Sequence, residues 1–509
     1  MDRVFDRLLS ALACAAPLVA QDPGRADTRP ATRRLPDVAE DATKALRPQG
    51  NRPELRSPED APARFDPKAA EPSSTALKQQ PDEGRMLGFD FARDPLNAKR
   101  PMTTFEEIRD AESAAKAGVT DAQRRFLESR FDLTPRFHDG VTMSRGKPVP
   151  KGPTARVREG TFDDLAGREP SAIRQAGAFP YPPLPHPLHV NGGQVFPRVQ
   201  IDMFPRLERF DVDFDLPDPF IPEFPPAIFL NNRPELGDVS RGEVLHLGNF
   251  HRLMKNLITP VQMEGLRLLL LPLAQEEFNL TDDRKSPEPT MGVACLDCHV
   301  NGHTTAQFHL SPDIRPQERR FRLDTTSLRG VFNQQIHGSK RSLRSVEDFT
   351  EFEQRTAYFN GDPIRPMKKG FMELPRSVIP HMAQMQNMFD FPPAPKLTPL
   401  GRLDPARASD SELRGEAVFF GKGQCATCHV PPFYLDHLMH DLRLERFTAE
   451  PGDGPIKTFT LRGIKDSPPY LHDGRCLTLE DTVEFFNLVL GLRLTAQEKT
   501  DLVAFMLCL

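Results

Sequence analysis

The sequence predicts a mainly helical protein in which two tandem domains follow a proline-rich, partly disordered N-terminal extension. Three observations support this fold class. The 509 residues include 52 prolines, about twice the usual share. In the last 250 residues, capping motifs precede apolar residues at helical spacing. In the same region, residues 328–352 resemble residues 461–485.

The N-terminus has the pattern of an export signal. Arg3 and Arg7 precede an apolar run from Leu8 to Ala20, and small residues offer a cleavage site near Ala20. We therefore predict a signal peptide over residues 1–20 and a periplasmic or exported protein; an amphipathic N-terminal helix is the alternative. Because no other run approaches the ~20 apolar residues that span a bilayer, we predict no transmembrane segment.

The next part of the chain divides by composition. Residues 21–85 are rich in Pro, Arg, Asp, Glu and Ala and have too few large apolar side chains to offset the entropy of ordering, so they predict a disordered linker. Residues 86–255 form an N-terminal extension whose role the sequence does not indicate. Within it, residues 103–118 and 120–131 predict two amphipathic helices, the second capped by Thr120 or Asp121.

Three acidic residues alternate with apolar ones in RFDVDFDLP. On a β-strand, this period of two places Asp211, Asp213 and Asp215 on one face. A solvated strand face is the favoured interpretation, and a Ca²⁺ site is the alternative. The net charge of −5 and the pI of about 6.3 give no indication of a nucleic-acid partner.

The C-terminal half contains clear helix starts. Ser409, Thr478 and Thr495 each precede an acidic residue by three positions and an apolar helical pattern. These signals predict a first helical domain over residues 256–400 and a second over residues 401–509.

Two C-x-x-C-H motifs carry the chemistry of this half. The motif is the attachment signature of c-type haem: both thiols form thioethers with the porphyrin, and the next residue brings an imidazole to the iron. Chance predicts about 0.003 such motifs for this composition. We therefore predict two covalently bound haem c groups, attached through Cys295, Cys298, Cys425 and Cys428, with His299 and His429 as iron ligands.

Two other interpretations of the cysteine pairs are weaker. A shared zinc ribbon normally places its pairs ~15–20 residues apart, and these pairs lie 130 residues apart. If the pairs were redox dithiols, the two histidines that follow them would have no role, and nothing nearby predicts a thioredoxin-like unit. For Cys476 and Cys508 we predict no disulfide, because helical periodicity gives Cys508 a packing role.

The repeat extends beyond the motifs. Leu-Arg-Gly opens both copies, and Ser345-x-x-Asp348 and Thr478-x-x-Asp481 predict the same capped helix in each. His309 and His440 occupy nearly the same place in the two copies, which makes each a candidate sixth ligand, a propionate partner or a packing residue. His303 has no counterpart in the second copy and is predicted to be a surface or packing residue.

From about residue 256 to the end, the chain resembles the bacterial di-haem cytochrome c peroxidase family, which includes MauG-type enzymes. The resemblance depends on both C-x-x-C-H motifs and on ELRGEAVFFGKGQCATCH, LRGIKDSPPYLHDGRCLTLED and LTAQEKTDLVAFM. It implies two cytochrome c-type domains. One haem accepts electrons from a small cytochrome c or cupredoxin, and the other, here on His299, reduces hydrogen peroxide.

The chain departs from the family in three ways. It has no tryptophan to lie between the haems. Gln354 matches a glutamine of the family. Family members have a glutamate ten positions later, where this chain has Ile364. PPYLHDG lacks a ligand methionine, which leaves Tyr470 as a candidate tyrosine ligand.

Three functions therefore remain open. The leading one is peroxide reduction, in which Glu347, Glu351 or Glu353 supplies the proton-transferring carboxylate; a solvated helix face is the favoured interpretation of these glutamates. The second is an electron relay with both irons six-coordinate. The third is a MauG-like oxidase that acts on a protein side chain.

Overall fold

We describe the protein from a computed structural model. The described residues are 105–184, 194–208, 212–275, 290–309, 322–353, 376–450 and 452–509, and all belong to one compact unit, Ser73–Leu509. The predicted signal peptide, the predicted linker over residues 21–85 and residues 86–104 of the predicted extension lie outside them.

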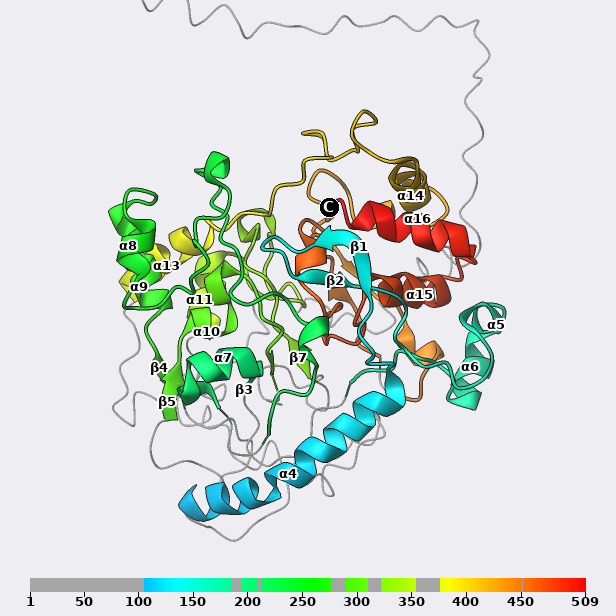
Figure 1. Ribbon diagram of the computed structural model, residues 1–509, viewed down its shortest axis with the longest axis horizontal. Helices are drawn as coiled ribbons and strands as arrows, with labels where there is room; N and C mark the ends of the chain where they lie inside the picture. Colours follow the sequence, from blue (N-terminus) through cyan, green and yellow to red (C-terminus); the bar gives the residue numbers. More distant parts are fainter. Residues whose placement is uncertain are drawn as a thin grey trace, which may run out of the picture. The chain divides into compact units, whose positions relative to one another are not determined.

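Helices provide most of the regular structure in the described part of the chain, as predicted (Figure 1). The α-helices are α4 (Phe105–Arg130), α5 (Phe162–Ala166), α6 (Pro170–Ala176), α7 (Arg198–Met203), α8 (Phe250–Met254), α9 (Pro260–Leu269), α10 (Cys295–Cys298), α11 (Val346–Phe352), α13 (Ile379–Gln386), α14 (Asp410–Phe420), α15 (Leu479–Val489) and α16 (Ala496–Met506). Single 3₁₀ turns are η2 (Pro205–Leu207), η3 (Asp218–Phe220), η4 (Pro234–Leu236), η5 (Val300–Gly302), η7 (Val331–Asn333), η9 (Arg376–Val378), η10 (Cys425–Thr427), η11 (Leu444–Arg446) and η12 (Ile464–Asp466).

The strands are short, and all their pairings are antiparallel. β1 (Phe137–Thr142) pairs with β2 (Pro148–Pro150), and β4 (Leu273–Gln275) pairs with β5 (Thr290–Val293). A three-stranded sheet has the order β3 (Gln194–Val195), β6 (Phe308–His309), β7 (Leu323–Asp324). β8 (Met439–His440) pairs with β9 (Ile456–Lys457).

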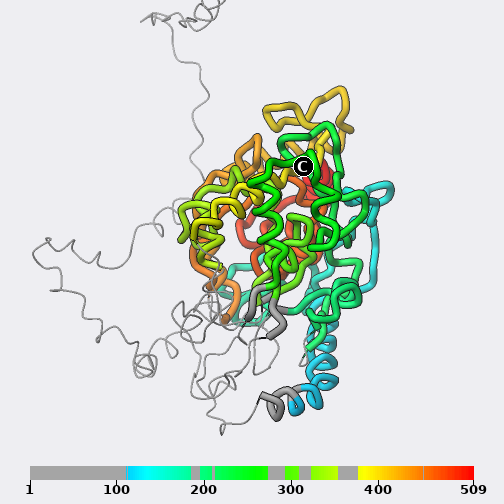
Figure 2. Tube along the Cα trace, turned by 90° about the vertical axis from the view of Figure 1, so that its left-hand side faces the viewer, coloured from blue at the N-terminus to red at the C-terminus, as the bar shows by residue number. Residues whose placement is uncertain are grey.

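Residues 105–130 form one continuous helix, α4, so the prediction of two helices here is wrong (Figures 1 and 2). The predicted second start at Thr120 or Asp121 does not occur because the helix passes Gly118 without a break. A Cβ at Gly118 would meet no atom within 4 Å. Glycine there costs about 1 kcal/mol relative to alanine, and extending a helix is easier than nucleating a new one.

The strand predicted for RFDVDFDLP is also not found, because residues 212–217 have no strand structure and residues 209–211 lie outside the described chain. Asp213 forms ion pairs with Arg198 and Lys116, and Asp215 forms a buried one with Arg322 at 2.9 Å. Both carboxylates therefore have cationic partners, at the positions where a Ca²⁺ site was the alternative interpretation.

Two hydrophobic cores organise the described residues. The C-terminal core combines α14, α15 and α16 with apolar residues of the extension between Leu127 and Ile221. The central core combines α8, α9 and α13 with Leu296 and Leu328. Met382, Met385 and Met388, which recur every third residue, are buried in the central core and pack there.

A buried carboxylate attaches the extension to the C-terminal core. Asp481 in α15 accepts hydrogen bonds from the backbone N–H of Thr154 (2.8 Å), from the Thr154 hydroxyl (2.6 Å), from the Ala155 N–H (3.1 Å) and from the Tyr181 hydroxyl (3.1 Å). Its burial raises its pKa, and the bonds from Thr154 and Ala155 oppose that effect. Because a buried carboxylate needs such partners, this network fixes residues 154–181 on α15.

The predicted helix caps are confirmed. Ser345 accepts a bond from the N–H of Asp348 (3.2 Å), and Thr478 accepts one from Asp481 (3.1 Å). Ser409 and Thr495 are the N-caps of α14 and α16, and the N–H of each also donates to the glutamate side chain three residues later. Local capping chemistry therefore sets the starts of these four helices.

Both copies of the repeat have the same backbone structure. His337 and Leu343 exchange two backbone hydrogen bonds (2.7 and 3.3 Å), as do Tyr470 and Cys476 at the positions 133 residues later (2.6 and 3.3 Å). Helices α11 and α15 begin at equivalent residues. The duplication inferred from the sequence is thus present in the fold.

A helix crossing is also repeated. α9 packs against α13, and α14 packs against α16 (Figure 1). At each crossing the first helix carries a glycine, and a Cβ on Gly265 or Gly415 would collide with the carbonyl group of His381 or Asp501, respectively. The two helix pairs therefore approach to backbone contact. Among the described residues, no helix combines the length and apolar character needed to cross a membrane.

We expect Gly415→Ala to destabilise the protein by about 1–3 kcal/mol, because the new methyl group overpacks the α14–α16 crossing. The matched control, Gly118→Ala on the open surface of α4, is expected to be neutral or to stabilise by up to ~1 kcal/mol. Urea unfolding followed by circular dichroism measures both. An unchanged midpoint for Gly415→Ala would contradict the close crossing.

Candidate functional site

The second C-x-x-C-H segment presents a neutral imidazole. After η10 the backbone turns so that Nδ1–H of His429 donates to the carbonyl of Tyr434 at 2.9 Å. Burial lowers the pKa of His429, so the ring is neutral at pH 7. A ring fixed through Nδ1–H leaves Nε2 as the ligand atom, which is how proteins commonly present histidine to a metal.

The first segment has the same arrangement. Cys295 and Cys298 begin and end α10, and His299 follows as its C-cap. Nδ1–H of His299 donates to the carbonyl of Thr326 at 2.9 Å, and burial lowers its pKa to about 4. Residues 310–321 and 354–375 lie outside the described chain. The structure therefore describes this site mainly on the side of Cys295, Cys298 and His299.

The motif cysteines are not activated thiols. Burial raises the pKa of Cys425 to about 12 and that of Cys428 to about 11, and it raises that of Cys298 strongly. Reactive dithiols instead have lowered pKa values. In the described chain, the only cluster of three metal-ligating side chains is Cys428, Asp436 and His440, within 4.8 Å of one another, so the two cysteine pairs share no site.

A cavity of about 300 Å³ adjoins the second motif. It is lined by Cys428 and His429, by aromatic residues of α15, and by groups from both copies of the repeat. Its polar lining includes His303, Asp324, Arg329, Gln334, Asp453, Lys457, Arg462, Tyr470, His472 and Arg475.

Several of these groups lack hydrogen-bond partners in the described chain. They are the buried Nη1 of Arg475, the Nε of Arg329 and the hydroxyl of Tyr470. Lys457 is also buried; its ammonium donates to the carbonyl of Gln334 at 2.8 Å, and desolvation lowers its pKa to about 8. Both guanidinium groups have ion pairs, Arg475 with Asp473 and Asp453 and Arg329 with Asp466, but a buried donor without an acceptor is costly. The two propionates of a haem are acceptors of the kind that these donors require. The cavity therefore fits haem c held by His429.

The other histidines take different roles. His303 is buried, with Nδ1 bonded to the Ser327 hydroxyl (2.7 Å) and Nε2–H to the Asp466 carbonyl (2.9 Å). Its predicted packing role is confirmed, and a surface position is wrong. His440 lines the cavity with Nε2 at 2.7 Å from Asp436. His309 pairs with Leu323 in β6–β7 as His440 pairs with Ile456 in β8–β9, so the two are equivalent in the fold; a ligand role for them stays a prediction.

Tyr470 lies in the cavity with its hydroxyl unpaired within the described chain. Burial raises its pKa well above the usual value, with contributions from Glu480 and Asp466. The position is compatible with the tyrosine ligand that the sequence suggests, which stays a prediction. Cys476 and Cys508 are both free, as expected.

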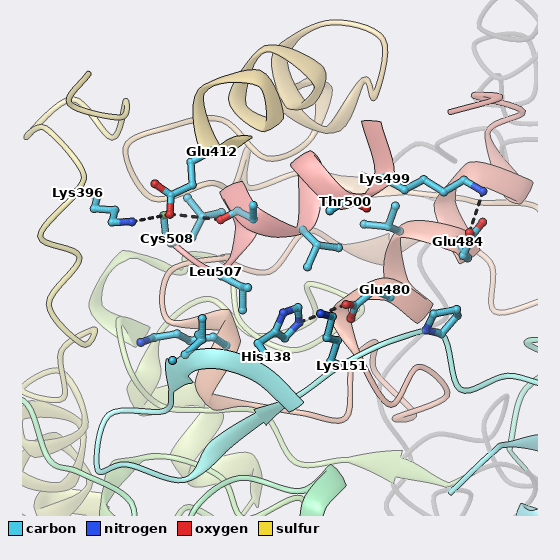
Figure 3. A pocket seen from close by; sticks show the side chains of 18 of the residues that line it. His138, Lys151, Lys396, Glu412, Glu480, Glu484, Lys499, Thr500, Leu507 and Cys508 are labelled. Carbon is cyan, nitrogen blue, oxygen red and sulfur yellow. Dashed lines mark hydrogen bonds and ion pairs between the residues drawn. The ribbon is translucent and has the colours of Figure 1, made fainter. Parts of the chain in front are cut away.

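A second, open cavity of about 840 Å³ lies on another face of α15 and along α16 (Figure 3). Glu480 lies next to His138 (3.2 Å) and Glu484 next to Lys499 (2.8 Å). This cavity is lined by charged pairs and by Pro392–Lys396, and contains none of the motif residues. Glu480 and Glu484 thus face away from the cavity of His429.

The sequence analysis missed the cations of the cavity beside His429. Arg329 and Arg462 belong to the two Leu-Arg-Gly segments, so their repetition was a signal that could have found them. Lys457 and Arg475 have no such signal, because their roles depend on burial beside residues more than 20 positions away, Gln334 and Asp453.

Comparison with known proteins confirms the resemblance. A cytochrome-c peroxidase, IdrP1, of Pseudomonas sp. strain SCT is 29% identical over 19% of this chain and 38% of its own length. A protein of the same name from Denitromonas iodatirespirans is also 29% identical, over 20% of this chain and 41% of its own length. The methylamine utilization protein MauG of Methylorubrum extorquens is 30% identical over 18% of this chain and 33% of its own length. Part of the chain is thus homologous to cytochrome-c peroxidases and MauG, and it spans about a third to two fifths of the length of these relatives.

No protein-family model matches the chain. Two solved structures give weak overall likenesses. Hydrazine synthase of Kuenenia stuttgartiensis has a TM-score of 0.32 at 19% identity, covering 53% of this chain and 94% of that one. A MauG-like protein associated with microbial copper homeostasis has a TM-score of 0.34 at 18% identity, covering 50% of this chain and 90% of that one. Scores this low do not establish a common fold.

His472 predicts a pH dependence of stability. Burial opposes its charge, but Asp453 and Asp473 outweigh burial and raise its pKa above 6.5. The resulting stabilisation is complete below about pH 6.5 and is lost as the pH rises through the folded-state pKa. We expect the difference in unfolding free energy between wild type and His472→Gln to shrink as the pH rises from 6 to 9. Denaturant titrations across this range measure it, and a constant difference would contradict the assignment.

Proposed function

We propose that the protein is an exported, periplasmic di-haem c-type cytochrome that reduces hydrogen peroxide with electrons from a small redox protein, a cytochrome c or a cupredoxin. The observation that carries the proposal is the repeated geometry of His299 and His429. Each is a neutral imidazole behind a C-x-x-C pair, with Nδ1–H bonded to a backbone carbonyl. The cytochrome-c peroxidase relatives support the reaction.

Each residue has a definite task in this proposal. Cys295 and Cys298 attach the first haem, and Cys425 and Cys428 attach the second. His299 and His429 ligate the two irons through Nε2, and the two helical units, residues 256–400 and 401–509, are cytochrome c-type domains. When bound, the haems supply the redox chemistry that accepts electrons and passes them to peroxide.

The protein residues hold charge and protons around that chemistry. Lys457 and Nη1 of Arg475 would donate hydrogen bonds to propionates in the cavity, and the Arg329–Asp466 pair (3.0 Å) fixes the wall between the two copies. Reduction of H₂O₂ to two waters consumes two electrons and two protons, so the peroxide-binding site also needs an acid–base side chain.

A second candidate function is an electron relay without peroxide chemistry. It is favoured by the lack of tryptophan and by Tyr470, whose hydroxyl faces the cavity and would close the iron of His429 if it were a ligand. The MauG relative keeps a third candidate, oxidation of a protein side chain, open.

Covalent haem content tests the foundation of the proposal. We expect the intact mass of protein matured in a c-type cytochrome host to exceed that of the processed chain by two haems. Cys425→Ala/Cys428→Ala should lose one haem, and Cys295→Ala/Cys298→Ala the other, because each pair forms its own thioethers. Cys476→Ala should keep both. A mass equal to that of the bare chain would refute haem attachment.

The oxidation of a reduced electron donor tests the proposed peroxide reduction. We expect peroxide-dependent oxidation of a reduced cytochrome c or cupredoxin, together with carbon monoxide binding to one of the two reduced haems, because peroxide chemistry requires one open iron. A relay with two closed irons binds no carbon monoxide and oxidises no donor. Stopped-flow absorbance spectroscopy measures both, and the relay becomes the conclusion if neither occurs.

A further inference from the structure

The N-terminal extension contacts the first C-x-x-C-H motif directly. Helix α7 of the extension lies beside α10, the short helix that contains Cys295 and Cys298 (Figure 1). A cavity of about 220 Å³ lies at this contact, and its lining includes Gln200 and Arg206 from the extension and Asp297 from the motif. Part of the extension, whose role the sequence does not indicate, is therefore placed at the first proposed haem site.

Buried amide side chains fix the backbone of this motif. Nε2 of Gln200 donates to the carbonyl of Asp297 at 2.7 Å, and the amide of Gln307 donates to the carbonyl of Cys298. The hydroxyl of Thr305 links the amide oxygens of Gln200 (3.0 Å) and Gln307 (2.9 Å). These three polar side chains are almost completely buried. Because a buried and satisfied polar network is rigid, the motif is held in place when a charge next to it changes.

An ion pair joins the extension to the residue that precedes Cys298. Nη2 of Arg206, in the turn η2, lies 2.7 Å from Oδ1 of Asp297, while Oδ2 accepts a bond from the N–H of Ala294 at 2.7 Å. The side chain of Asp297 is 9% exposed and that of Arg206 is 25% exposed. Salt and water therefore screen the two charges less than they screen a pair on the open surface.

The second motif differs at this position. Thr427 precedes Cys428, where the first motif has Asp297 before Cys298. A carboxylate next to a haem-attaching cysteine opposes the arrival of an electron on that haem, and a cation paired with the carboxylate cancels the effect. At an effective dielectric constant of ~20, a unit charge ~10 Å away changes a one-electron equilibrium constant by roughly a factor of ten.

We propose that Arg206 of the extension acts through Asp297 to set the reduction potential of the haem attached to Cys295 and Cys298. The proposal rests on the proposed di-haem function and gives the extension a part in it. The ion pair keeps this haem easier to reduce than it would be beside an unpaired carboxylate. Arg206 is thus a positioning residue that holds a compensating charge, and the amide network holds the motif against it.

Spectroelectrochemical titration of the full-length protein tests this role, after its intact mass has confirmed two haems. The potential that is missing from Cys295→Ala/Cys298→Ala belongs to the first haem. We expect Arg206→Gln to lower the equilibrium constant for reduction of this haem about tenfold, ~59 mV for one electron. Asp297→Asn should raise it by a similar factor. The double variant should return to within about twofold of wild type, because both charges are then absent.

Arg198→Gln is the matched control. Arg198 lies in the same segment, in α7, but its ion pairs are with Glu208 and Asp213 rather than with the motif. Both haem potentials should therefore stay within about twofold of wild type, expressed as equilibrium constants. Arg206→Lys keeps the positive charge and should stay within about threefold, which separates the loss of charge from the loss of the arginine side chain.

The outcomes separate this inference from the proposed function. If the potential of the first haem shifts in opposite directions in Arg206→Gln and Asp297→Asn but no peroxide is reduced, peroxide reduction fails and the role of Arg206 stands. An unchanged potential in Arg206→Gln overturns the inference, as do shifts in the same direction, which show a structural disturbance. If Arg206→Gln loses its first haem, Asp297→Asn decides, and an unchanged potential there overturns the inference. A mass equal to that of the bare chain overturns both.

Discussion

The buried ion pair between Arg329 and Asp466 is the constraint on which the cavity beside His429 depends. Nη1 of Arg329 lies 3.0 Å from the Asp466 carboxylate, and both side chains are almost fully buried. Nη2 of Arg329 donates to the carbonyl of Ala227, while the backbone carbonyl of Asp466 accepts from His303. Ser144 of the β1–β2 turn also donates to Asp466. Because removing one partner of a buried pair typically costs about 3–5 kcal/mol, the pair holds the central core, the C-terminal core and the extension in one arrangement around the cavity wall.

Local chemistry made some of the fold predictable. The helix starts at Ser345, Ser409, Thr478 and Thr495 depend on residues within one turn, so sequence patterns identify them. The two errors in the extension have a different origin. The α4 helix is continuous because Gly118 costs less than a new nucleus would, and Asp215 forms its ion pair with Arg322, a partner 107 residues away. Neither effect is visible in a local window of sequence.

The same division applies to the candidate site. Covalent attachment requires fixed spacing, so the cysteines and histidines proposed to hold haem could be named from the sequence alone. The groups that complete the cavity are brought together by tertiary structure: Tyr434 through its carbonyl, and Lys457 and Arg475 through burial. Internal duplication is the one long-range signal that a single sequence contains. It found the equivalence of His309 and His440, and in the structure it extends to the backbone bridges that begin at His337 and Tyr470.

The Asp481 network has a consequence for how the chain is made. Thr154 and Asp481 are separated by 327 residues, so the segment around Thr154 and Tyr181 leaves the ribosome long before its only set of buried partners on α15 exists. During that interval Phe179 and Tyr181 have no core to enter, and exposed aromatic side chains favour aggregation. Synthesis of this polypeptide therefore includes an interval in which these aromatic side chains wait for the last helices.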